Sequence, residues 1–322
     1  GKEQPAPGEA GKSAGSLLVT RSASSAVSLI VSGGLPARAS RETFRQAGGL
    51  LARWLVDNKV SAAILDTDAF DGLGVEQALY SVCEGLLLGS YQFSKYKKAG
   101  QQSVCSFYLK SSHPAELTAT LLDIETTCYS VNLARQVIHE PANVINPQTL
   151  SELALGLAEQ YGLKCTVFDS AQLQEMKAGA LLAVGKGSQT PSRLIVLEYA
   201  GQKTGQAPIA LVGKAITFDT GGYSLKGTEN ILGMKYDKAG GVSVLATLIA
   251  AARLKLPQPL VGIIPTAENM ISGGSYRPDD ILTSMSGKTI EIVSTDAEGR
   301  LILADALTYT QRTFKLAALI DM

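Results

Sequence analysis

Residues 211–241 read LVGKAITFDTGGYSLKGTENILGMKYDKAGG, and the expected fold is organised around this stretch. The apolar run Ile209–Val212 predicts a buried strand, which delivers Lys214 at its end. Asp219 and Asp237 are each followed shortly by a glycine pair, and the second pair opens a predicted helix. Because glycine pairs let the backbone turn sharply or approach a ligand, both aspartates are expected beside turns.

A second acidic segment, STDAEGR at residues 294–300, comes directly after the predicted strand Ile290–Val293. Its two carboxylates can face one site if the chain bends there. The sequence therefore places four carboxylates near predicted strand or helix ends: Asp219, Asp237, Asp296 and Glu298. Carboxylates gathered in this way repel one another and raise one another's pKa values unless cations balance them.

Positive charge is available nearby from Lys214, Lys226 and Arg300, and two divalent cations would supply the rest. Carboxylate oxygens suit magnesium and manganese, and zinc accepts them as well. The only two histidines, His113 and His139, cannot build an imidazole-rich zinc site and leave few options for a Ser-His-Asp triad. The structural alternative, a set of surface salt bridges and helix caps, explains each acid alone but not their grouping.

Composition narrows the class of protein. With 322 residues the chain exceeds what one ordinary core supports, so two domains are expected. Basic and acidic residues are equal at 29 each, so no charge excess points to nucleic acid. No apolar run is long enough to span a bilayer, and residues 1–15 lack the apolar segment of a signal peptide. The four cysteines are scattered without a CxxC pair, which is typical of a reducing compartment.

The alternation of strand and helix patterns predicts the α/β class. We expect a small N-terminal α/β domain over residues 1–112, a connecting helix within 113–140, and a larger α/β domain over 141–322. The larger domain is expected to hold a central mixed sheet flanked by helices. In the small domain we expect strands at 16–20, 26–31, 60–65 and 103–109 and helices at 40–58 and 74–88.

In the larger domain, Pro141 and Pro147 are expected to end the connecting helix. The next helix, at 151–161, is expected to begin at a cap formed by Thr149 or Ser151. Further predicted elements are a helix at 243–254 and strands at 165–168, 194–198, 209–212, 260–265, 290–293 and 316–322.

Three other patterns are given little weight. The GxSxG match at Gly11–Gly15 lacks the preceding strand and following helix that a nucleophile elbow requires. The run Gly185–Ser188 could bind an anion, yet a strand-to-turn glycine pair explains it equally well. His139 ends the connecting helix, where capping or packing is favoured over catalysis.

Several segments between Asn132 and Met322 form a recognisable set. They are ARQVIHEPANVINP, VGKAITFDTGG, SLK, MKYD, ENM with a following SGG, YRP, DI, TSMSGKT and TDAEGRLILADALTY. These segments resemble the signature of the leucyl aminopeptidase (cytosol aminopeptidase) family, and the last is highly specific. Residues 1–112 match only in general character. The resemblance implies a metallopeptidase catalytic domain over 141–322.

The resemblance also implies roles for individual residues. The family's metal ligands correspond to five positions: Lys214, Asp219, Asp237, Asp296 and Glu298. It implies that Asp219 and Glu298 bridge both metals. It further implies that Asp296 binds the first metal through its side chain and backbone carbonyl, and that Lys214 and Asp237 bind the second.

Three more residues carry implied roles in substrate handling. Lys226 and Arg300 resemble the two cationic residues that act without binding metal, and Arg300 is expected to hold a bicarbonate ion. Met234 resembles a wall of the pocket for the substrate's first side chain. Zinc or manganese is the expected metal, with magnesium and cobalt as alternatives. The resemblance implies a cytoplasmic homo-hexamer that acts on peptides with a free N-terminus, with a leucine-like preference.

Three positions depart from the family's usual pattern without removing a ligand. Ser294 stands where asparagine is usual, Lys238 where methionine is usual, and Asp279 where glycine is usual. These departures bear on the geometry around the metals and on substrate preference.

Three alternative functions are considered. A dinuclear phosphohydrolase would use the same metals but needs more cationic donors for a phosphate. A catalytically silent metal-binding homologue would be expected to have lost Lys214, Asp237 or Glu298, and all three are present. A binding or regulatory protein acting through the N-terminal domain finds no support in the charge balance. The chain is expected to be part of a longer family protein, and a polypeptide ending at Met322 is expected to be inactive.

Overall fold

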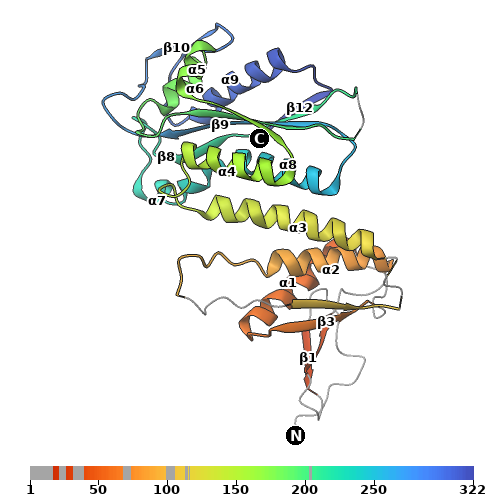
Figure 1. Cartoon of the computed structure of the whole chain (residues 1–322). Coiled ribbons are helices and arrows are strands. Elements are labelled where there is room, and N and C mark those ends of the chain that lie inside the picture. The colour runs from red at the N-terminus through yellow and green to blue at the C-terminus, as the bar shows by residue number, and fades with distance from the viewer. Residues whose placement is uncertain are drawn as a thin grey trace. The chain divides into compact units, whose positions relative to one another are not determined.

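The computed structural model describes residues 17–21, 27–31, 40–67, 74–98, 106–112, 115, 117–202 and 205–322, the first two ranges as backbone. The predicted loop at residues 1–15, with its Gly11–Gly15 match, and His113 lie outside these residues. The chain divides into two compact units, Gly1–Asn132 and Leu133–Met322, and the boundary falls inside helix α3 (Thr118–His139). Figure 1 shows both units and labels several elements of each.

Strands and helices alternate in the first unit, which confirms a small α/β domain. In chain order the elements are β1 Leu17–Arg21, β2 Val27–Val31, α1 Arg41–Asp57, β3 Ala62–Asp66, α2 Val75–Gly89, β4 Ser106–Lys110 and the start of α3. Strands β1 and β2 pair antiparallel, whereas β3 and β4 pair parallel. Helix α1 is capped by Ser40, whose hydroxyl accepts the backbone N–H of Thr43 at 3.2 Å.

The second unit is built on a mixed sheet, as predicted, and this sheet has six strands. Its strands are β5 Lys164–Phe168, β6 Arg193–Tyr199, β7 Ile209–Val212, β8 Ala215–Asp219, β9 Leu260–Asn269 and β12 Ala318–Asp321. The order is β12-β7-β9-β6-β5, with β8 also pairing with β9. Strands β7, β8 and β9 run parallel, and β6 runs antiparallel to β9. The parallel strands carry their carboxyl ends to the same edge of the sheet.

Helices cover both faces of this sheet (Figure 1). Helices α4 (Pro147–Tyr161) and α8 (Ala239–Leu254) pack on one face, and α5 (Ser170–Glu175), α6 (Gly179–Gly185) and α9 (Glu298–Thr313) on the other. Alternate residues of β6 serve the two layers, since Ile195 and Leu197 join one core and Leu194 and Val196 the other. Among the described helices, none is long and apolar enough to cross a membrane.

The predicted start of α4 is wrong by several residues. Its cap is Asn146, whose side chain accepts the backbone N–H groups of Gln148 and Thr149 at 3.0 Å each. Pro147 was interpreted as a terminator of the preceding helix, but it is the first residue of this one. Proline suits that position because the first N–H of a helix needs no intrahelical acceptor.

Other elements around the acidic residues were missed or misplaced. Strand β8 and helix α9 were not predicted, and α8 begins at Ala239 rather than at 243. The short elements α7 (Thr228–Ile231), η3 (Met234–Lys238, a 3₁₀ helix) and β10 (Ile281–Thr283) were also missed. Strand β11 covers Thr289–Glu291 instead of 290–293. Most of these elements are only three to five residues long, which is too short to show a hydrophobic period.

Candidate metal centre

The predicted metal ligands come together at the carboxyl ends of the parallel strands. Asp219 is the last residue of β8, and Lys214 lies between β7 and β8. Asp237 lies in η3, Asp296 precedes α9, and Glu298 is the first residue of α9. This edge is where open α/β sheets commonly bind ligands, because the loops there converge.

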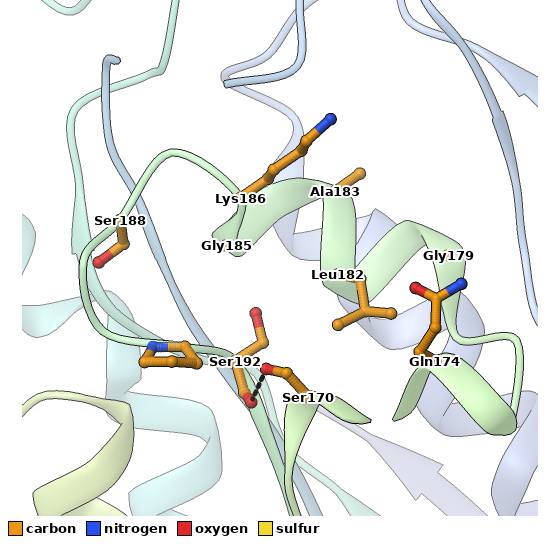
Figure 2. A pocket seen from close by; sticks show the side chains of 10 residues that line it. Ser170, Gln174, Gly179, Leu182, Ala183, Gly185, Lys186, Ser188 and Ser192 are labelled. Carbon is orange, nitrogen blue, oxygen red and sulfur yellow. Dashed lines mark hydrogen bonds between the residues drawn. The ribbon is translucent and has the colours of Figure 1, made fainter. Parts of the chain in front are cut away.

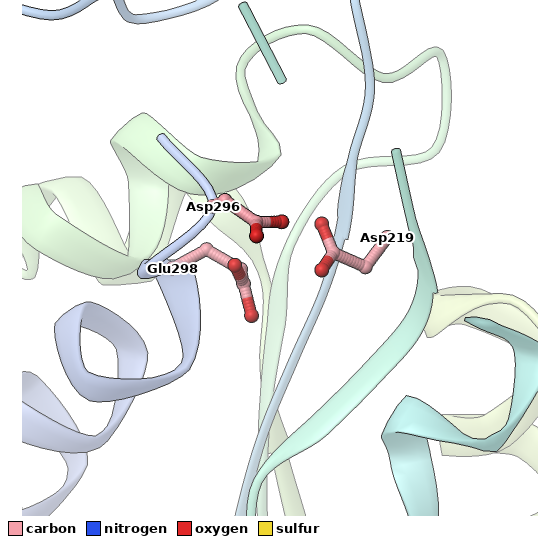
Figure 3. A group of neighbouring side chains, drawn as sticks. All are labelled: Asp219, Asp296 and Glu298. Carbon is pink, nitrogen blue, oxygen red and sulfur yellow. The ribbon is translucent and has the colours of Figure 1, made fainter. Parts of the chain in front are cut away.

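Three of the carboxylates point toward one another (Figure 3). One oxygen each from Asp219, Asp296 and Glu298 lies within 4.8 Å of the others, a spacing that fits a cation between them. Asp219 and Glu298 are each only 2% exposed, whereas Asp296 is exposed. The group therefore opens to solvent on the side of Asp296.

Two lysines link the remaining members of the site. Nζ of Lys214 lies 2.8 Å from Oδ1 of Asp237 and 2.7 Å from Oε1 of Glu298. Nζ of Lys226 lies 2.8 Å from Oδ2 of Asp219 and also pairs with Asp296. Each ammonium group thus sits between two carboxylates, and all five predicted ligands belong to one charged cluster.

The cluster holds more negative than positive charge. The pKa of Asp237 is raised to about 6, because burial and, to a smaller extent, the charges of Glu298 and Asp219 outweigh the hydrogen bond and charge of Lys214. Burial lowers the pKa values of both lysines, but their hydrogen bonds to carboxylates outweigh it, so both pKa values are raised overall. An additional cation would relieve the remaining repulsion.

Buried residues that sequence reasoning missed hold Asp219 in place. Asn269, the last residue of β9, donates through Nδ2 to Oδ1 of Asp219 at 2.7 Å. The N–H of Gly221 donates to the same oxygen at 2.9 Å. These contacts fix Oδ1 and leave Oδ2 facing Lys226. The only available signal for Asn269 was its place in the quoted ENM segment, to which no role was assigned.

Thr295 joins the two acidic segments. Its hydroxyl donates to the carbonyl of Gly221 at 2.6 Å and accepts the N–H of Ser224 at 2.8 Å. Its carbonyl accepts from Asn269 at 2.9 Å and from the hydroxyl of Tyr276 at 2.8 Å. Burial raises the pKa of Tyr276, which keeps this hydroxyl protonated as a donor. The loop after β8 and the segment before α9 are therefore fastened together.

Gly299, the second residue of α9, makes room for Lys214. A Cβ atom at position 299 would lie 2.7 Å from Cδ and Cε of Lys214 and 2.8 Å from its Nζ. The lysine side chain passes over this glycine to reach Glu298. Glycine is therefore needed directly after Glu298, because a side chain at position 299 would clash with Lys214.

A separate cavity of about 500 Å³ lies beside α5 and α6 and is lined in part by Lys186 and three serines (Figure 2). The serines are used within the protein: Ser170 donates to the carbonyl of Ser192, and Ser188 donates to Glu268. Lys186 points away from the cavity in Figure 2. The run 185–188, considered above as an anion site, therefore presents no converging donors there.

Comparison with known proteins identifies the group to which this chain is related. The pattern described as "Cytosol aminopeptidase family, catalytic domain" matches residues 132–322, and that of the family's N-terminal domain matches residues 5–100. A probable cytosol aminopeptidase of Geotalea uraniireducens (strain Rf4) is 44% identical over 252 residues, covering 76% of this chain and 51% of that protein. The chain belongs to the cytosol aminopeptidase family.

Other family relatives agree in sequence and fold. A probable cytosol aminopeptidase of Syntrophotalea carbinolica (strain DSM 2380 / NBRC 103641 / GraBd1) is 42% identical over 302 residues, covering 91% of this chain and 61% of that protein. The solved bottromycin maturation enzyme BotP is 34% identical with a TM-score of 0.84, covering 96% of this chain and 66% of that one. Its complex with Mn gives 33% identity and a TM-score of 0.85. The chain spans 51% to 61% of the length of the two curated relatives.

The donor set of this family member fits divalent cations. Oδ2 of Asp237 and Oε2 of Glu298 are buried and, within the described part of the chain, accept no hydrogen bond. A buried carboxylate oxygen without a partner is costly, so each oxygen calls for a cation or donor. Carboxylate oxygens are ligands that zinc, manganese and magnesium all accept.

Met234 and Arg300, which are expected to act on the substrate without binding metal, lie in or beside the elements that carry the predicted ligands. Met234 opens η3 and is half-buried. Arg300 is exposed on the first turn of α9, and no described residue pairs with its guanidinium. His139 ends α3, packs edge-on against Tyr236 with ring centroids 5.5 Å apart, and places Nδ1 2.7 Å from the carbonyl oxygen of Arg135, in keeping with the expected capping or packing role.

The three departures from the family pattern have local consequences. Asp279 adopts a φ of +70°, the left-handed region that favours glycine. The hydroxyl of Ser294 accepts the N–H of Asp296 at 3.2 Å, which steadies a predicted ligand. Lys238 is fully buried at 0% exposure. None of the three departures therefore removes a predicted ligand, and Ser294 contacts one directly.

Proposed function

We propose that the complete protein is a metal-dependent aminopeptidase that releases N-terminal residues, with a leucine-like preference, from peptides with a free amine. The observation that carries the proposal is one charged cluster, at the carboxyl edge of the sheet, that contains Lys214, Lys226 and four carboxylates. Membership of the cytosol aminopeptidase family favours peptides over phosphate esters as substrates. The presence of every predicted ligand argues against the alternative of a catalytically silent homologue.

The proposed ligand assignment follows the arrangement of the cluster. Asp219 and Glu298 would contact both cations, Asp296 would bind the first, and Lys214 with Asp237 would bind the second. Bound divalent ions would acidify a water molecule and polarise the scissile carbonyl. Zinc and manganese are the favoured ions, with magnesium and cobalt as alternatives. Lys214 would have to lose its proton to bind metal, so metal and proton compete for the same nitrogen.

Residues of the chain would supply the remaining chemistry. Lys226, next to Asp219 and Asp296, would donate to the oxyanion as its charge develops. Arg300 presents an exposed planar fork suited to an anion such as bicarbonate, which would carry the proton. Met234 would line the pocket for the first side chain. We also propose a cytoplasmic location, since the relatives are named cytosol aminopeptidases, and the homo-hexamer that the family resemblance implies.

The test compares substrates and metal content of the complete protein. We expect hydrolysis of a leucyl amide, no hydrolysis of its N-acetylated form, and no hydrolysis of a phosphomonoester, because the free amine is part of recognition. Elemental analysis should find two divalent ions per chain and fewer in Asp219→Ala. Cleavage of the acetylated amide, or undiminished metal in Asp219→Ala, would contradict the proposal. Light scattering tests the hexamer, and a stable active monomer would count against it.

A further inference from the structure

Two lysines of η3 reach the carboxyl-terminal end of α3. Nζ of Lys235 donates to the carbonyl of His139 at 2.7 Å, and Nζ of Lys238 donates to the carbonyl of Glu140 at 2.9 Å. The last carbonyls of a helix lack intrahelical partners, and cationic donors there also interact favourably with the helix dipole. These contacts fasten one side of η3 to the end of α3.

Lys238 is the more unusual of the two. It is fully buried, and its ammonium group also donates to the carbonyl of Lys235. Burying an ammonium group is costly, and burial together with the charge of Lys235 lowers the pKa of Lys238 to about 8. The residue also caps the amino-terminal end of α8, where the helix dipole disfavours positive charge. Its favourable contribution therefore comes from the carbonyls that it holds.

The other side of the same segment is fixed by Lys214. The N–H of Gly241 donates to the carbonyl of Lys214 at 2.6 Å, and Nζ of Lys214 lies 2.8 Å from Oδ1 of Asp237. Asp237 directly precedes Lys238, and Met234 opens the same 3₁₀ helix. A shift of Lys238 would therefore move both residues relative to Lys214.

We infer that Lys238 is a positioning residue for the metal site, holding η3 so that Asp237 and Met234 keep their places. The inference rests on the proposed function, in which Asp237 binds the second metal and Met234 lines the substrate pocket. Lys238 itself touches neither metal nor substrate. Its loss is expected to act on one metal and on the choice of the first side chain, because the other four proposed ligands lie outside η3.

The main test is Lys238→Leu, which keeps an apolar side chain of similar bulk but has no donor, and which is not the methionine usual at this position in the family. Exposed Lys288→Leu is the matched control. In a calorimetric titration of the apoprotein with manganese, we expect one binding step to weaken by about 10- to 100-fold. The ratio of kcat/KM for leucyl over alanyl amide should fall as well. Two binding steps and a substrate ratio equal to those of wild type would overturn the inference.

A second variant separates positioning from general instability. Lys238→Ala leaves a space that propylammonium can enter and in which it can donate to the freed carbonyls. We expect propylammonium to restore the weakened metal step, and tetramethylammonium, which has no N–H group, not to do so. Equal effects of the two ions would overturn the inference. A wild-type protein that binds no pair of metals would instead refute the proposed function.

Discussion

Asn269 donates to Oδ1 of Asp219 at 2.7 Å and to the carbonyl of Thr295 at 2.9 Å. One fully buried amide thus connects the end of β9 to both acidic segments of the site. Because one acceptor ends β8 and the other lies in the segment before α9, the amide ties the segment that carries Asp219 to the segment that leads to Glu298.

Replacing Asn269 by alanine should weaken metal binding and turnover without removing a ligand. Outer hydrogen-bond partners of metal ligands typically change metal affinity by about 10- to 100-fold, and we expect a loss in that range. Metal titration and kcat/KM on a leucyl amide measure it. The control is Asn58→Ala, an exposed residue whose amide only caps α1 through the carbonyl of Trp54. Equal metal affinity in Asn269→Ala and wild type would disprove the role.

Lys226→Ala should lower kcat more than it raises KM. An interaction with the developing oxyanion strengthens in the transition state, so its loss appears mainly in turnover, by about 100-fold or more. The exposed Lys315→Ala serves as the control. Steady-state kinetics on a leucyl amide give kcat and KM for the variant and the wild type. A change confined to KM would show that Lys226 only binds the substrate.

Arg300→Ala should abolish any dependence of the rate on bicarbonate. The guanidinium is exposed and pairs with no described residue, so it is available to an anion. Rates measured over a range of bicarbonate concentrations in wild type and variant provide the test. An identical bicarbonate dependence in the two proteins would remove Arg300 from the mechanism.

Two glycines of the first unit should respond oppositely to alanine. A Cβ atom at Gly85 would lie 2.0 Å from the carbonyl oxygen of Arg45, so Gly85→Ala should force α1 and α2 apart and cost about 1–3 kcal/mol. At Gly49 the nearest atom would be 3.9 Å away, so Gly49→Ala should be neutral or stabilising by roughly 0.5–1 kcal/mol. Chemical unfolding of both variants measures the difference. Similar stabilities would contradict the close helix contact.

Asp305 should make an identifiable contribution to stability. Its carboxylate accepts the N–H groups of Leu181 at 2.9 Å and Met285 at 2.7 Å, and Asp305→Ala should cost about 1–3 kcal/mol for the donors left unpaired. Burial raises the pKa of Asp305 above its ordinary value, although these hydrogen bonds oppose the shift. Protonated Asp305 therefore adds to the free energy of unfolding at pH values below the ordinary aspartate pKa. This contribution is lost as the pH rises through the pKa of Asp305 in the folded protein. Asp305→Asn should lack this dependence, and identical pH profiles of unfolding would refute it.

The regular elements with strong periodicity could be predicted from the sequence. Helices α1 and α2 and strands β5, β6 and β7 lie within a few residues of their expected ranges. Their side chains repeat with the helical or strand period, so local sequence carries the information. The predicted start of α4 was wrong because a proline such as Pro147 is compatible both with the end of one helix and with the first turn of the next.

The sequence by itself was enough to propose the metal ligands, because the identities and spacing of the residues from Lys214 to Arg300 match the family signature. Only the tertiary structure decided how they are held. Asn269 and Thr295 lie far from Asp219 along the chain, yet hydrogen bonds join them across the sheet edge. Lys238 likewise meets the end of α3 only because η3 folds back onto it. Such contacts depend on the packing of distant segments, which neither residue periodicity nor motif spacing encodes.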